Sequence, residues 1–115
     1  MRLAESQVTD EAAWTVADLI RKYKPTVLPT HWRGSFHQDH INCHDIVQRA
    51  LSRAGLPTFR RQNPAHYPKQ VLYAENWENM DGYSPDIYLD VTDIFRDYLK
   101  LLKTHARKLC KLSLL

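Results

Sequence analysis

Apolar residues recur at helical spacing in three parts of the chain. One stripe begins at about Thr9 or Asp10, a good capping position, and stops before Pro25, which predicts a first helix. A second stripe follows Asn42, another capping residue, and ends at Gly55. A third starts at about Asp93 and continues through basic residues toward the C-terminus. The pattern therefore predicts three helices.

Short β-compatible runs predict three strands, at residues 58–60, 70–74 and 85–92. In the last run, apolar residues alternate with polar ones, and Asp90 lies on the polar face. Residues 25–41 are expected to form a loop. The expected fold class is α/β (α+β): a single small domain with a central three-stranded sheet flanked by three helices.

Length and composition favour one compact domain. The chain has 115 residues, of which 43% are hydrophobic, enough for a single core. We divide it into an N-terminal helix and loop, 1–41, and a core, 42–115. No run approaches the roughly 20 apolar residues of a membrane span, so no membrane partner is expected. Cys43 and Cys110 make no disulfide framework, which favours an intracellular, reducing compartment.

Charge is distributed unevenly along the chain. Residues 75–93 contain acids and no base, whereas residues 96–115 are strongly basic. A second basic group is interleaved with aromatic residues, a composition suited to a phosphate backbone and stacked bases. Ordinary solvated surface is the alternative. The residues expected to bind DNA or RNA are Arg53, Arg60, Arg61, Lys69, Trp32 and Tyr67.

Several short motifs resemble the restriction-endonuclease-like domains, of the PD-(D/E)XK type, that occur beside reverse transcriptases and in mobile-element proteins. A His-Asp pair opens a helix that ends in Ala-Gly, and an Asp-Val-Thr sequence closes a strand. The resemblance implies that fold and a metal-dependent nuclease ancestry. It covers about residues 40–112, through the segments 43–57, 71–73, 76–77, 81–82 and 89–92.

The resemblance also implies roles for individual residues. Asp90 would be the metal-binding carboxylate, with Mg²⁺ as the cofactor, because phosphodiester hydrolysis needs carboxylate oxygens around such an ion. Gln70 stands where the family has a second acid, and Thr92 where it often has a lysine. His44 and Asp45 would orient water or phosphate near the metal. The two departures leave open a domain that binds nucleic acid without cleaving it.

Two other interpretations remain open. Cys43 would lie in the first turn of the second helix, where the dipole lowers a thiol pKa, as in a cysteine hydrolase. Alternatively, the chain is a non-enzymatic interaction module of a larger protein or ribonucleoprotein assembly.

Zn²⁺ is not the expected cofactor. His37, His40, Cys43 and His44 are suitable ligand types at suitable spacing. The second, distant pair of ligands that usually completes a zinc site is missing.

Overall fold

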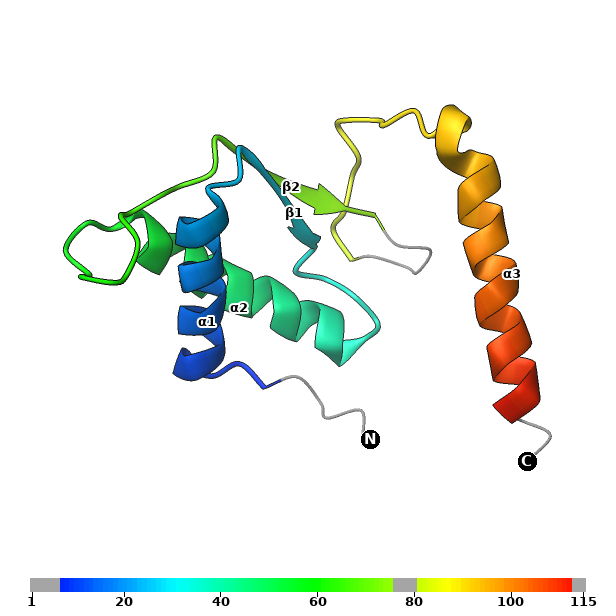
Figure 1. The fold of residues 1–115 in the computed structure, drawn as a ribbon, viewed down its shortest axis with the longest axis horizontal. Coiled ribbons are helices and arrows are strands. Elements are labelled where there is room, and N and C mark those ends of the chain that lie inside the picture. The colour runs from blue at the N-terminus through cyan, green and yellow to red at the C-terminus, as the bar shows by residue number, and fades with distance from the viewer. Residues whose placement is uncertain (1–6, 76–80, 113–115) are drawn as a thin grey trace. The chain divides into compact units, whose positions relative to one another are not determined.

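The computed structural model describes residues 7–75 and 81–112, with no description of the side chains of residues 108–112. The chain divides into two compact units, Met1–Ser84 and Pro85–Leu115, and whether they make one domain stays a prediction. The described elements, in chain order, are α1 (Asp10–Tyr23), β1 (Val27–His31), α2 (Gln38–Gly55), β2 (Gln70–Ala74), the 3₁₀ helix η1 (Thr92–Ile94) and α3 (Phe95–Leu112) (Figure 1).

The predicted first helix is confirmed. Thr9 is its N-cap, and the hydroxyl oxygen accepts a hydrogen bond from the Ala12 N–H at 3.1 Å. Lys24 ends the helix in the left-handed conformation, with φ 48°, and its N–H donates to the carbonyl of Ile20. Pro25 then prevents continuation. Local sequence therefore determines both ends of α1.

The core lies where α1 packs against α2 (Figure 1). Ala17, Ala50 and Ala54 have no exposed surface, and these small side chains let the two helices approach closely. Leu28 of β1 and Val71 of β2 pack against this cluster. The first unit therefore buries one face of its sheet against its helices.

In the described residues the sheet has two parallel strands, so the expected three-stranded sheet is wrong, whereas the resemblance to restriction-endonuclease-like domains stays a prediction. Val27 pairs with Gln70 and His31 with Ala74. The strand at 70–74 is confirmed as β2, but its partner β1 lies in the segment expected to be a loop. Because parallel strands need a crossover connection, β1, α2 and β2 form a β-α-β unit.

The other two predicted strands are not strands. Residues 58–60 form turns and irregular chain after α2. Residues 85–91 are irregular, and residue 92 begins η1. The alternation of apolar and polar residues around Asp90 suggested a strand. A strand also needs a neighbouring strand to pair with, which periodicity alone does not supply.

The second helix begins earlier than predicted. Its N-cap is His37, and Asn42 lies inside α2, where its side-chain oxygen accepts a hydrogen bond from Nε2 of Gln38 at 2.9 Å. The end at Gly55 is confirmed, and Pro57 follows directly after the extended Leu56. The early start adds one full turn to the helix.

The buried guanidinium of Arg21 holds the C-terminal end of α2. Arg21 is only 1% exposed, although it belongs to α1. It donates five hydrogen bonds of 2.8–3.2 Å to backbone carbonyls, namely those of Arg53, Ala54, Leu56, Phe59 and Asn63. A cation is favoured here because the last carbonyls of a helix carry partial negative charge. Arg21 thus joins α1, α2 and the following loop.

The second unit contains η1 and α3. Apolar residues recur along α3 at helical spacing, among them Phe95, Leu99 and Leu102, as the sequence predicts. Among the described helices, none is both long enough and apolar enough to cross a membrane.

Replacing Arg21 should destabilise the protein strongly. Arg21→Met would remove five hydrogen bonds to backbone carbonyls, of which those of Ala54 and Leu56 keep a backbone N–H donor, and we expect a loss of about 3 kcal/mol or more in the free energy of unfolding. Arg21→Lys should recover only part of this free energy of unfolding, because an ammonium group cannot donate in the planar, forked arrangement of a guanidinium. Urea unfolding measures both. Lys22→Met is the matched control at an exposed neighbour, and an equal loss there would contradict this role for Arg21.

Candidate functional site

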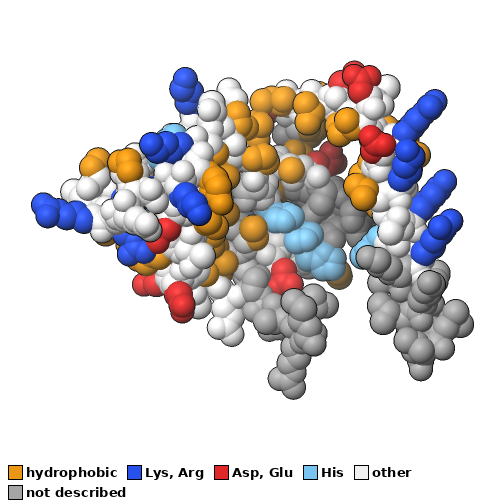
Figure 2. All heavy atoms as spheres, in the orientation of Figure 1, with side chains coloured by type: hydrophobic (Ala, Val, Ile, Leu, Met, Phe, Trp, Pro, Cys, Tyr) orange, Lys and Arg blue, Asp and Glu red, His pale blue; other side chains and the backbone are white. Residues whose placement is uncertain are grey.

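Four histidines gather where β1 leads into α2. The rings of His31 and His40 are stacked, with centroids 4.3 Å apart and planes 5° from parallel. The His37 ring lies edge-on to His40, with centroids 5.2 Å apart. Nδ1 of His44 is 2.9 Å from the carbonyl oxygen of His31. We call these four residues the histidine group, and Figure 2 shows pale blue histidine side chains clustered near the middle of the drawn face.

Helix geometry explains most of this grouping. His37 caps α2, and His40 and His44 follow at three and seven residues, so all three lie along one face of the helix. His31 is the last residue of β1 and enters from the strand side. Ends of parallel strands and starts of the following helices commonly build sites in this kind of unit.

The loop from β1 to α2 is held by the turn at residues 81–82. The Trp32 indole N–H donates to the carbonyl of Asp81 at 2.8 Å. A Cβ placed on Gly34 would lie 2.5 Å from that same carbonyl oxygen, so only glycine allows this approach. The Tyr83 hydroxyl donates to the carbonyl of Tyr73 at 2.9 Å. The histidine group therefore starts from a loop with defined geometry.

Ser35 lies between two members of the histidine group. Its hydroxyl oxygen accepts from the His37 N–H at 3.2 Å and is 3.2 Å from Nδ1 of His40. Three of the four imidazoles are half-buried, whereas His37 is exposed. The arrangement brings several imidazoles together at one place, and imidazole is the side chain best suited to proton transfer at neutral pH.

Metal binding would need more than the described part of the chain supplies. In residues 7–75 and 81–112, no three His, Cys, Asp or Glu side chains are grouped so that they could hold an ion. Mg²⁺ at Asp90 stays a prediction.

The sequence contained a signal for this site that the early helix start concealed. The sequence analysis placed the start of the helix at Asn42, so His37 and His40 fell in the expected loop. Their spacing then did not indicate that they lie on one face of a helix. Once α2 starts at Gln38, the same spacing becomes a helical face. His31 had no such signal, because it reaches the group only through the folding of β1.

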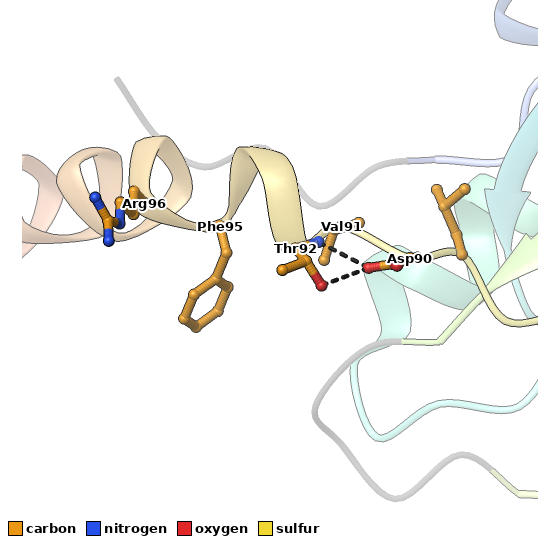
Figure 3. Close-up of a pocket in the computed structure, with 6 residues that line it drawn as sticks. Asp90, Val91, Thr92, Phe95 and Arg96 are labelled. Atoms are coloured by element: carbon orange, nitrogen blue, oxygen red, sulfur yellow. Dashed lines mark hydrogen bonds between the residues drawn. The ribbon is translucent and has the colours of Figure 1, made fainter.

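Asp90 is exposed and belongs to the second unit (Figure 3). Its Oδ1 accepts hydrogen bonds from the backbone N–H and the hydroxyl of Thr92, and these bonds lower the pKa of the Asp90 carboxyl. The carboxylate thus caps the turn that enters η1. The same segment, with Phe95 and Arg96, lines a surface pocket of about 500 Å³.

The other residues of the implied nuclease site lie in the first unit. Gln70 is the exposed first residue of β2, and its N–H donates to the carbonyl of Thr26 at 3.1 Å. Asp45 is exposed inside α2. The joint action of these residues with Asp90 stays a prediction.

Cys43 does not occupy the first turn of a helix. It lies inside α2 and packs partly against the core, so the expected effect of the helix start on its thiol loses its basis. A cysteine hydrolase stays a prediction with weaker physical support.

Two of the candidate nucleic-acid residues are engaged within the first unit. Arg53 donates to a carboxylate oxygen of Asp10 at 2.7 Å, and Arg61 pairs with Asp18 through two nitrogens. Both guanidinium groups also lie over the ring of Trp14, at 5.0 and 4.5 Å from its centroid. These contacts tie α2 and the following loop to α1.

The two ion pairs also lower the pKa values of their aspartates. The hydrogen bond from Arg53 lowers the pKa of Asp10, and that from Arg61 lowers the pKa of Asp18.

The remaining candidates are spread over the first unit. Arg60 and Lys69 are exposed in the segment between α2 and β2. The ring of Tyr67 lies so close to Gly55 that a Cβ there would be 2.9 Å from it. Trp32 is half-buried among aromatic rings. Nucleic-acid binding by this set stays a prediction.

Part of the chain is similar in sequence to a known protein. No protein-family model matches the chain. A stretch of 55 residues is 38% identical to a 1D-myo-inositol 2-acetamido-2-deoxy-alpha-D-glucopyranoside deacetylase 2 from Frankia casuarinae, and it covers 46% of this chain but only 18% of that protein. The chain thus matches less than a fifth of the deacetylase.

A solved structure shares the fold. The crystal structure of the conserved protein TT1542 from Thermus thermophilus matches with a TM-score of 0.68 and 16% sequence identity. The match covers 79% of this chain and 40% of that one. At this identity the likeness concerns the fold alone.

Gly34→Ala should separate the loop from the turn at Asp81. The new Cβ would meet a backbone oxygen at 2.5 Å, which cannot move aside as a side chain can. We expect the indole N–H of Trp32 to lose its hydrogen bond and exchange faster with solvent, measured by NMR hydrogen exchange. Ser84→Ala, at an exposed position of the same segment, is the control. Unchanged exchange in Gly34→Ala would refute the close approach.

The ion pair of Asp18 should stabilise the protein only above acidic pH. Since Arg61 lowers the folded-state pKa of Asp18 below its ordinary value of 3.8, the stabilisation is complete above that value and disappears as pH falls through the folded pKa. Asp18→Asn should therefore unfold at lower urea than wild type at pH 7, and the difference between the two should shrink as the pH falls below 3.8. Asp45→Asn is the exposed control. A gap that persists at low pH would contradict the assignment.

Proposed function

We propose that this chain is part of a hydrolase that removes the acetyl group from an acetylated amino sugar, and that the histidine group supplies its proton-transfer chemistry. The observation that carries the proposal is that the rings of His31 and His37 both lie against that of His40 at the β1–α2 junction, with centroids 4.3 and 5.2 Å from the His40 centroid. The local identity to a deacetylase supports it. Because the chain matches a small part of that protein, further parts of the site would come from outside the matched stretch.

The proposed reaction is the hydrolysis of an amide. A water oxygen bonds to the acetyl carbon, the carbon–nitrogen bond breaks, and acetate and a free amine leave. One water proton must be removed during attack, and the departing nitrogen must receive a proton. A neutral imidazole can take the first proton, and a protonated imidazole can supply the second or stabilise the oxyanion.

The positions of the imidazoles suit this division of roles. His37 is exposed at the helix start, where it can reach a bound substrate. His40 is half-buried between the rings of His31 and His37, so its orientation is constrained by its neighbours. A constrained base next to an accessible one is a suitable arrangement for moving a proton between water and a leaving group.

The test is acetate release by the purified protein from 1D-myo-inositol 2-acetamido-2-deoxy-α-D-glucopyranoside. We expect His37→Ala and His40→Ala each to lower kcat/KM by about 100-fold, because proton transfer by a positioned side chain contributes that order of magnitude. Unfolding midpoints should stay close to wild type, which separates loss of chemistry from loss of fold.

His105→Ala is the matched control, since it removes a histidine of α3 that lies outside the histidine group. Its activity should equal that of wild type. Absence of acetate release by the wild type, or full activity in both His37→Ala and His40→Ala, would overturn the proposal. Mg²⁺-dependent cleavage of DNA or RNA that is lost in Asp90→Ala would instead support the nuclease prediction.

A further inference from the structure

His44 is the member of the histidine group whose protonated nitrogen follows from geometry. Its Nδ1 lies 2.9 Å from the carbonyl oxygen of His31. A carbonyl oxygen can only accept a hydrogen bond, so Nδ1 carries the proton. In the neutral ring, Nε2 then holds the lone pair. The ring therefore has a defined orientation and a defined tautomer.

Aromatic side chains hold the ring of His44 in place. Tyr73 lies with its centroid 5.4 Å from that of His44, and Trp32 approaches edge-on at 6.5 Å. Both neighbours are themselves anchored: the Tyr73 hydroxyl accepts from Nε2 of Gln48 at 2.8 Å, and the Trp32 indole donates to Asp81. The surroundings thus restrict rotation of the His44 ring.

His31 is consequently attached to α2 at two points. Its carbonyl accepts from His44, and its imidazole stacks on His40, one helical turn earlier. The two contacts come from residues four apart on the same helix face. The main-chain contact therefore sets where the last residue of β1 lies along α2, and so where its ring meets that of His40.

We propose that His44 is a positioning residue of the histidine group: its Nδ1–H holds the main chain of His31 and thereby keeps the imidazole of His31 stacked on that of His40. The effect on catalysis rests on the proposed function, whereas the effect on geometry does not. Side chains that position a reacting group through a backbone carbonyl commonly influence activity without touching the substrate.

The hydrogen bond is tested first in the wild-type protein. Two-bond ¹H–¹⁵N spectra of the imidazoles distinguish the two neutral tautomers. We expect His44 to be protonated on Nδ1. A neutral His44 protonated on Nε2 would overturn the proposal, and this measurement does not depend on any variant folding.

Two variants then test separately the hydrogen-bond donor and the aromatic ring of His44. His44→Phe keeps an aromatic ring against Tyr73 and Trp32 but has no donor, whereas His44→Asn keeps an N–H donor near the position of Nδ1. The ring signals of His31 and His40 should shift in His44→Phe and return toward their wild-type positions in His44→Asn. His105→Phe, the same substitution at a histidine of α3 outside the histidine group, should leave them unchanged. Unshifted signals in folded His44→Phe would overturn the positioning role.

Activity provides the second readout. In the acetate-release assay, His44→Phe should lower kcat about tenfold or more with little change in KM, since misplacement of a reacting group affects the transition state more than binding. His44→Asn should recover a large part of that loss. Unaltered kcat in an active His44→Phe protein would overturn the catalytic consequence. Wild-type protein that releases no acetate would overturn the proposed function alone, because the spectra still decide the positioning role.

Discussion

The arrangement of the first unit depends on one buried cation. Arg21 reaches from α1 to the C-terminal end of α2 and to the loop that follows, where it donates to five backbone carbonyls. Among the described residues no carboxylate forms an ion pair with Arg21, and backbone dipoles surround the buried charge instead. These hydrogen bonds connect α1 to α2 and to the loop leading to β2. The alanine-rich interface between the two helices packs beside them.

Packing of α2 has a direct consequence for the histidine group. The C-terminal half of the helix is held by Arg21 and the core, while its N-terminal half carries His37, His40 and His44 toward the end of β1. A helix anchored at one end by packing can present polar side chains at the other with little cost in stability. The site is therefore built on a rigid element and completed by a short loop.

Elements that depend on local sequence signals were predicted correctly. Elements that depend on the pairing of distant strands were not. The caps and stripe of α1, the end of α2 at Gly55 and the strand at 70–74 were all predictable. β1 was not, because its five residues include Pro29 and a pattern that acquires meaning only beside β2. The alternation around Asp90 looked more strand-like but has no ladder partner among the described strands. Likewise, three of the four histidines could have been grouped from spacing alone had the helix start been placed correctly.

The sequence by itself determined the helix stripes, most of their ends and the residue types available for chemistry, because these depend on side chains a few positions apart. Tertiary structure decided which of those residues meet. His31 joins His40 across the β1–α2 junction, and Arg53 and Arg61, two candidate phosphate ligands, form ion pairs with Asp10 and Asp18. The physical reason is that these contacts join residues far apart in the sequence. They comprise strand pairing, burial of a guanidinium and ion pairs, and a local sequence pattern does not predict them.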